Sequence, residues 1–235
     1  MKVTYIYHSS FLVELDSVNL LFDYYKGEIP TMDLEKPLIV FASHVHGDHF
    51  SKKIFKLMES HSNIQYILSD DIEEKNIPSH CREKVLFVHP NEKWKQEIPE
   101  LEIETFHSTD EGVAFWICCE GKTIYHAGDL HFWFWKGECD EWNQMIADQY
   151  HKEIGKLKGR HANIAFLVLD PRQEEAFYFG INDFMKIVSA DHIVPMHCWG
   201  DYSVISKMKQ LSCARSYQER IAEIQKEGDT FEWNN

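Results

Sequence analysis

Side chains that can bind metal gather in residues 43–50, which read Ser-His-Val-His-Gly-Asp-His-Phe. Four of them fall within six residues: His44, His46, Asp48 and His49. Neutral imidazoles and a carboxylate are donors that a borderline divalent cation such as zinc accepts. A solvated polar loop is the alternative, but such a loop needs no such density of donors. The segment therefore predicts a metal site.

The elements around this segment must hold its donors in place. Strands are expected at 3–7, 11–15, 18–22, 38–42, 64–68, 85–88, 94–98, 101–106, 113–118, 123–126, 164–169 and 193–196. Helices are expected from Ser51 onward and over 141–157, 182–189 and 203–226, with a frayed end behind the last. Strands that feed single helices, without a linker, indicate one α/β layered domain over residues 1–235.

Length and composition narrow the class of protein. Of the 235 residues, 44% are apolar or aromatic, and no window of about 18 apolar residues occurs, so no transmembrane helix is expected. The first residues read as a strand and not as a signal peptide. The six cysteines are scattered without a C-x-x-C pair, which indicates reduced thiols. These features predict a cytoplasmic protein that does not bind a membrane.

The charge of the chain bears on its partners. The formal net charge is −14, and an acidic surface repels phosphate backbones. The basic residues in 152–160 are expected on the solvated face of a helix. Nucleic acid is therefore not an expected partner, and a small molecule is.

The two halves of the chain share an order of features: a His after a strand, an Asp that ends a hairpin and a His that ends a buried strand. In chain order these are His8, Asp23 and His44, then His107, Asp129 and His197. Chance is the alternative, because strand–turn patterns are common. A true repeat predicts two similar half-sheets packed face to face, with their strand ends meeting at one site.

The H-x-H-x-D-H segment at 44–49, together with His107, Asp129 and His197 at strand or hairpin ends, resembles the metallo-β-lactamase superfamily. The resemblance covers residues 1 to about 200, and the first motif is the specific one. The settings of Asp129 and His197 are most similar to the subgroup of ascorbate-phosphate lactonase-like hydrolases. The resemblance implies an α+β fold, a four-layered αβ/βα sandwich.

Carried onto this sequence, the resemblance implies two divalent cations, zinc or alternatively manganese. The implied ligands are His44, His46 and His107 for the first cation, and Asp48, His49 and His197 for the second. Asp129 would bridge both, since a shared carboxylate offsets the repulsion between two cations. The pKa of bound water falls towards about 7, which makes a hydroxide available for attack. Asp48 would also accept a proton from that water.

Five further residues could act beside these ligands. His8 is either a core-edge histidine bonded to backbone or a group that contacts a ligand or the substrate. Asp23 either caps a strand end or accepts the N–H of a metal-bound imidazole. His131 is placed to protonate a leaving group, or else lies on the surface. Asp170 and Arg172 follow a buried strand, and the arginine would bind an anionic substrate or form a structural ion pair.

The first hypothesis for function is a hydrolase that uses a dinuclear metal-bound hydroxide on a small ester, lactone, thioester or phosphoester, anionic substrates included. A different class is a redox or sensing protein with iron in the same ligands and little hydrolysis. Oxidoreductase members of the superfamily need a flavin domain or partner, and the sequence shows no such pattern. A ribonuclease-like phosphodiesterase is the third hypothesis, which the lack of an extended basic module disfavours.

Overall fold

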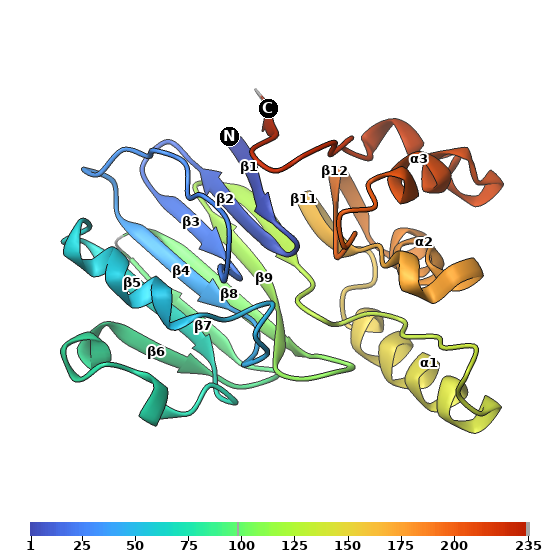
Figure 1. Ribbon diagram of the computed structural model, residues 1–235, viewed down its shortest axis with the longest axis horizontal. Helices are drawn as coiled ribbons and strands as arrows, with labels where there is room; N and C mark the ends of the chain where they lie inside the picture. The colour runs from blue at the N-terminus through green and yellow to red at the C-terminus, as the bar shows by residue number, and fades with distance from the viewer. Residues whose placement is uncertain (98, 234–235) are drawn as a thin grey trace.

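The computed structural model describes residues 1–97 and 99–233, whose strands form two sheets (Figure 1). Within this part of the chain the first sheet has the order β13-β1-β2-β3-β4-β5-β6 and the second has the order β12-β11-β10-β9-β8-β7. The strands are β1 (Lys2–Tyr7), β2 (Ser10–Glu14), β3 (Asn19–Phe22), β4 (Leu38–Ala42), β5 (Ile64–Ser69), β6 (Val85–Val88), β7 (Lys93–Gln96), β8 (Leu101–His107), β9 (Val113–Cys119), β10 (Lys122–His126), β11 (His161–Val168), β12 (Ser189–Met196) and β13 (Thr230–Glu232).

Each sheet begins with antiparallel pairs and continues with parallel ones. In the first sheet β1, β2 and β3 are antiparallel, and β3 to β6 are parallel. In the second sheet β7 to β10 are antiparallel, and β10 to β12 are parallel. The carboxyl ends of parallel strands share one edge of a sheet, where ligand-binding loops commonly lie.

The two sheets pack face to face through aromatic side chains. The ring of Phe11 in β2 lies 4.5 Å from that of Phe166 in β11, and Phe41 in β4 lies 5.2 Å from Phe115 in β9. The outer face of the first sheet forms a second apolar cluster, into which a run of 3-10 turns, η1 (Lys52–Glu59), inserts Ile54. The outer side of the second sheet carries the three α-helices (Figure 1). The expected four-layered sandwich is therefore confirmed.

The helices differ in their bounds from those that the apolar periodicity predicts. They are α1 (Asp140–Gly155), α2 (Phe179–Ile187) and α3 (Ser203–Gln210), and the short 3-10 turns are η2 (Glu74–Asn76), η3 (Ser79–Lys84), η4 (Pro171–Ala176), η5 (Ser212–Ala214) and η6 (Gln218–Arg220). The helix expected from Ser51 is η1, and the one expected over 203–226 is helical only in α3.

The end of the chain packs against its beginning. The expectation of a frayed end was wrong as far as residue 233, because β13 pairs antiparallel with β1. That expectation at 234–235, and the end of the strand expected at 94–98, at Ile98, lie outside the described residues. Within the described residues no helix is long and apolar enough to cross a bilayer.

Candidate metal centre

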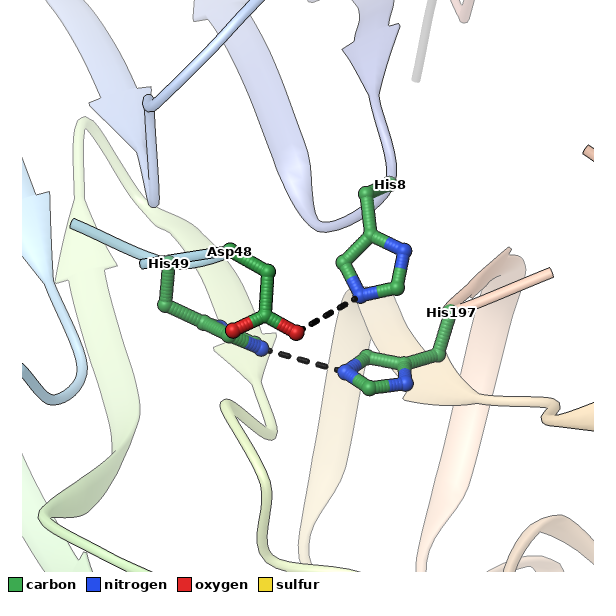
Figure 2. A group of neighbouring side chains, drawn as sticks. All are labelled: His8, Asp48, His49 and His197. Atoms are coloured by element: carbon green, nitrogen blue, oxygen red, sulfur yellow. Dashed lines mark hydrogen bonds and ion pairs between the residues drawn. The ribbon is translucent and has the colours of Figure 1, made fainter. Parts of the chain in front are cut away.

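The ends of strands from both sheets bring two groups of donor side chains together. The His197 group consists of His8, Asp48, His49 and His197 (Figure 2), and the His44 group consists of His44, His46, Asp110 and Asp129. In each group one donor atom from every member lies within 4.8 Å of the others. The structure therefore collects six of the seven ligands expected from the sequence, all but His107, and adds His8 and Asp110.

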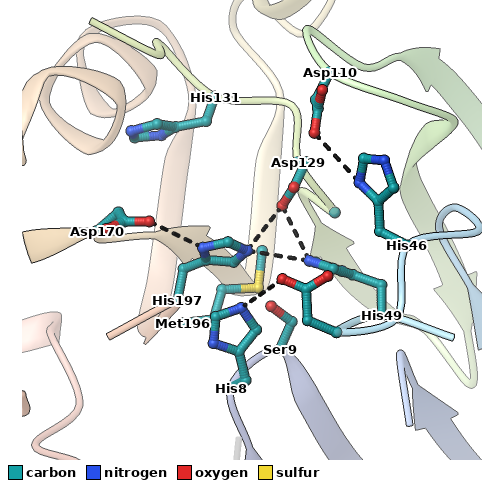
Figure 3. A network of polar contacts seen from close by, with 12 residues as sticks. His8, Ser9, His46, His49, Asp110, Asp129, His131, Asp170, Met196 and His197 are labelled. Carbon is teal, nitrogen blue, oxygen red and sulfur yellow. Dashed lines mark hydrogen bonds and ion pairs between the residues drawn. The ribbon is translucent and has the colours of Figure 1, made fainter. Parts of the chain in front are cut away.

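Two buried carboxylates fix the ring orientation of His49 and His197. The Nδ1 atom of His49 lies 2.7 Å from Asp23 Oδ2, and that of His197 lies 3.2 Å from Asp170 Oδ2. Because each Nδ1–H donates to a carboxylate, each Nε2 presents its lone pair to the centre (Figure 3). Asp23 and Asp170 thus do what metal-bound histidines require of their neighbours.

These lone pairs meet other acceptors. The Nε2 atoms of His49 and His197 are 3.1 Å apart, and they lie 3.2 and 3.1 Å from Oδ1 of Asp129. Three buried acceptors at such separations repel one another unless a cation or a proton lies between them. Ligands about 2.1 Å from a tetrahedral zinc ion are about 3.4 Å apart, so these residues fit a divalent metal.

Asp23 also organises the His44 group, through Ser43. Ser43 donates its hydroxyl to Asp23 Oδ2 at 2.7 Å and accepts from His44 Nδ1 at 3.0 Å. The Nε2 atom of His44 is consequently a buried acceptor, and it has no hydrogen-bond partner among the described residues. It lies 3.7 Å from Oδ2 of Asp129, the oxygen that Asp129 does not turn towards His49.

The close packing of these groups shifts their pKa values. Burial opposes ionisation of Asp129, but His49 and His197 outweigh it and hold the pKa of the carboxyl well below its ordinary range. Burial likewise disfavours the charged imidazoles, yet Asp129 raises the pKa of both His49 and His197. Burial and the neighbouring His49 lower the pKa of His44 to about 3. The carboxylate of Asp129 therefore favours positive charge at this position, as it would favour a bound cation.

His8 is not a core-edge histidine bonded to backbone but a member of the centre. Its Nε2 is buried and lies 3.6 Å from Asp48 Oδ2 (Figure 2). Burial lowers the pKa of His8 to about 4, although Asp48 opposes the shift. Burial raises the pKa of Asp48, but His8 and His49 lower it more, so this carboxylate is ionised at neutral pH.

Backbone strain is concentrated at the centre. His8, Asp23, His197 and Trp199 all have positive φ, at 55°, 43°, 67° and 51°. Such conformations cost about 1–3 kcal/mol each and persist where the surroundings impose them, commonly at functional sites. Three of these residues, His8, Asp23 and His197, directly follow the strands β1, β3 and β12.

The structure places Asp110 where the sequence suggested His107. Asp110 Oδ2 lies 3.5 Å from His46 Nδ1, whereas His107 is exposed and its Nδ1 binds the carbonyl of Ser108 at 2.5 Å. His107, the last residue of β8, belongs to neither donor group. The loop that follows folds back through a hydrogen bond from Ser108 N to Gly112 O, at 3.1 Å, and this brings Asp110 to the metal side.

His131 also departs from its expected role. Its ring is buried, its Nε2 lies 2.7 Å from Gln173 Oε1, and it is not among the residues that line the pocket over the ligands. Gly180 packs so closely that a Cβ there would lie 2.3 Å from the ring. Figure 3 shows His131 to one side of the ligand network, so His131 supports structure and does not face a leaving group.

Arg172 forms the structural ion pair that was one of its two expected alternatives, and binding of an anionic substrate stays a prediction. Its Nε and Nη2 bind Asp170 at 2.9 and 2.5 Å, and the side chain also lines the pocket. This pocket has a volume of about 280 Å³ and opens over the ligands. Four tryptophans complete its wall: Trp133, Trp135, Trp142 and Trp199.

Comparison with known proteins identifies the family of the chain. Residues 2–138 match the family described as a beta-lactamase superfamily domain. The chain belongs to the metallo-β-lactamase superfamily. A protein of Alkaliphilus metalliredigens named as a UPF0173 metal-dependent hydrolase is 28% identical in an alignment of length 146 that covers 55% of this chain and 63% of that protein. The match thus spans somewhat less than two thirds of that relative.

Solved structures show that the superfamily fold extends over the whole chain. Igni18, a metallo hydrolase from Ignicoccus hospitalis, superposes with a TM-score of 0.61 at 19% identity and covers 99% of both chains. The metallo-β-lactamase fold protein YhfI from Bacillus subtilis gives a TM-score of 0.61 at 16% identity, with 98% of both chains covered. At these identities the likeness concerns the fold alone.

Proposed function

We propose that this superfamily member is a metal-dependent hydrolase with two divalent cations, one in the His44 group and one in the His197 group. The observation that carries the proposal is Asp129, whose Oδ1 lies 3.2 Å from His49 Nε2 while its Oδ2 lies 3.7 Å from His44 Nε2. One carboxylate with an oxygen on each side is the arrangement that a bridging ligand requires. Imidazole and carboxylate donors suit zinc, with manganese as the alternative.

Two such cations would polarise a substrate oxygen and lower the pKa of water at the centre. The protein itself supplies the proton acceptor. Asp48 lines the pocket, its side chain is 30% exposed, and its carboxylate is ionised beside His8. We therefore assign Asp48 the role of taking a proton from the attacking water at a carboxylate oxygen. We propose a small ester, lactone, thioester or phosphoester as the substrate. The substrate is expected to be small because the pocket is smaller than the roughly 300–1,000 Å³ of drug-sized sites.

The test compares Asp129→Ala with Glu59→Ala, which removes an exposed carboxylate on η1. The wild-type protein should contain two zinc or manganese ions per chain by elemental analysis and should hydrolyse simple esters or phosphodiesters. Asp129→Ala should lose metal and at least about 100-fold in turnover, while Glu59→Ala should match the wild type. Full turnover with both metals retained in Asp129→Ala would refute the bridging role, and iron with a visible spectrum and no hydrolysis would refute the proposed function.

A further inference from the structure

The pocket has a wall of tryptophan side chains beside the ligands. The stacked rings of Trp133 and Trp135 lie 5.9 Å apart with 7° between their planes, and Trp133 is 5.6 Å from the ring of His197. Trp199, on the other side of Arg172, is 47% exposed. Aromatic side chains that line a concave pocket are typical of sites that bind small molecules.

The tryptophan wall is held rigidly. Gln173 Nε2 donates to the carbonyls of Phe132 and Phe134 at 2.9 and 3.3 Å, and its Oε1 accepts from His131. The side chain of Asn143 binds both the backbone N–H and the carbonyl of Trp135 at 2.9 Å. The buried His131 thus belongs to a brace for the loop. A braced wall loses little conformational entropy when a ligand binds, as a specificity surface requires.

Arg172 adds a charged edge to this surface. Its guanidinium lies 4.4 Å from the ring centroid of Trp199 and 5.7 Å from that of Trp135. Asp170 occupies its Nε and Nη2, and among residues 1–97 and 99–233 no hydrogen bond to its Nη1 is found. The side chain is 48% exposed, so the Nη1 donors remain available to a ligand.

Building on the proposed function, we propose that the natural substrate carries a flat aryl group that stacks on this wall and an anionic substituent that binds Arg172. The hydrolysable bond would then lie over the ligands while the aryl group fills the rest of the small pocket. The substrate class narrows to small aryl esters or aryl phosphoesters with a carboxylate or a similar anion on the ring. A saturated ring or a simple alkyl group offers no face for stacking.

Matched phosphonates separate the aryl contribution from metal binding. Binding of methylphosphonate and phenylphosphonate to the metal-loaded protein is measured by titration calorimetry. Phenylphosphonate should bind about tenfold more tightly, because its ring stacks and is buried. Trp135→Leu should reduce this ratio to about two, and the bonds of Asn143 to the backbone of residue 135 should keep that variant folded. Trp94→Leu, in β7 and outside the pocket, is the control and should keep the full ratio.

The charged edge is tested with 4-carboxyphenylphosphonate. Its carboxylate should add about fivefold in affinity, and Arg172→Gln should abolish this gain while leaving the phenyl-to-methyl ratio in place. Equal affinities for the methyl and phenyl compounds, or no binding of phenylphosphonate, would overturn the aryl proposal. If the carboxylate raised the affinity of Arg172→Gln as much as that of the wild type, the claim that an anionic substituent binds Arg172 would be overturned.

Failure of this inference can be told apart from failure of the proposed function. A protein that hydrolyses simple esters but shows no aryl preference keeps the hydrolase assignment and loses the substrate class. A protein that binds the aryl compounds through Trp135 but hydrolyses nothing keeps the ligand class and loses the hydrolase assignment.

Discussion

One buried aspartate organises both halves of the metal centre. Asp23 is fully buried and accepts from the backbone N–H of Ser43 at 2.7 Å, from the Ser43 hydroxyl at 2.7 Å and from His49 at 2.7 Å. Through Ser43 it also sets the ring of His44. Of its two expected roles, strand-end cap or acceptor for a ligand imidazole, the bond with His49 favours the second, which stays a prediction. A carboxylate is needed here because all three neighbours donate.

Asp23→Asn should therefore weaken metal binding without removing a ligand. The amide has one acceptor oxygen and turns an N–H towards a neighbour that is itself a donor. Loss of such an orienting partner typically costs 10–100-fold in metal affinity, and we expect a loss of about that size. Competition with a chromophoric chelator measures it.

Asp33→Asn is the matched control for this change. Asp33 is exposed and accepts from the backbone N–H of Glu35 through one oxygen, which an asparagine can do as well. Its metal affinity should equal that of the wild type. Equal affinities in all three proteins would show that Asp23 does not orient the ligands.

Among single residues, several donors in one short segment predicted the donor groups better than one donor at a strand end did. The donors at 44–49 could be predicted because residues so close in sequence stay close in space: His44, His46, Asp48 and His49. Asp110 could not, since Ser-Thr-Asp-Glu-Gly reads as an ordinary turn and the strand-end His107 was the more conspicuous donor. The choice depends on which face the last residue of β8 takes, and a step of one residue reverses that face.

Between elements, the β8–β9 loop and the end of β4 touch at a glycine. Gly112 has a φ of +68°, and a Cβ there would lie 2.0 Å from the carbonyl oxygen of Ser43 and 2.6 Å from His44 Cβ. The amide of Val113 donates to the same Ser43 carbonyl at 2.9 Å. This contact sets the distance between the segment 44–49 and Asp110.

Gly112→Ala should consequently disrupt the fold and the metal centre together. Strain at positive φ costs about 1–2 kcal/mol, and overlap with the β4 end adds to it, so we expect a loss of about 3 kcal/mol in the free energy of unfolding. Gly121→Ala is the control, because Gly121 has a φ of +70° but nothing within 4 Å of the added methyl group. Urea denaturation of both variants measures the effect of the contact at Gly112. Equal losses in the free energy of unfolding would contradict a role for this contact.

The elements themselves were predictable where tertiary pairing agrees with local pattern. The helix expected at 141–157 is α1 within two residues at each end, because its apolar stripe packs on the second sheet. The prediction of a helix over 203–226 was wrong after residue 210, where α3 ends. There Ile221 forms a bridge with Ile193, and Ala222 donates to the Ile193 carbonyl at 2.8 Å, so pairing with β12 overrides the helical pattern.

On the scale of the whole molecule, the internal repeat is present but in another register than the sequence suggested. The order antiparallel, antiparallel, parallel, parallel occurs in β1–β5 and again in β8–β12. The counterpart of β4, which ends two residues before His44, is β11, which ends two residues before Asp170. His197 follows β12, the counterpart of β5. Sequence spacing could not show this, because the excursion through α1 and α2 hides the equivalence.

Because the ligands come from both sheets, bound metal ions should hold the two sheets together and stabilise the fold. Chelation should lower the melting temperature by about 5–10 °C where free metal had been about 100 times its dissociation constant. The difference should be larger near pH 8 than near pH 6. His49 and His197 have raised pKa values in the metal-free protein, so their protons compete with metal at the lower pH.

The sign of this dependence follows from linkage. The raised pKa of His49 and His197 means that their protons stabilise the metal-free fold below the ordinary histidine pKa and that this stability is lost as the pH rises through the folded value. His8 and His44 have lowered pKa values and are neutral with or without metal, so they cancel in the difference. Calorimetry of loaded and chelated protein at both pH values measures it, and Asp129→Ala should show little stabilisation by metal at either. A difference that shrinks towards pH 8 would mean that the imidazoles of His49 and His197 do not hold the ions.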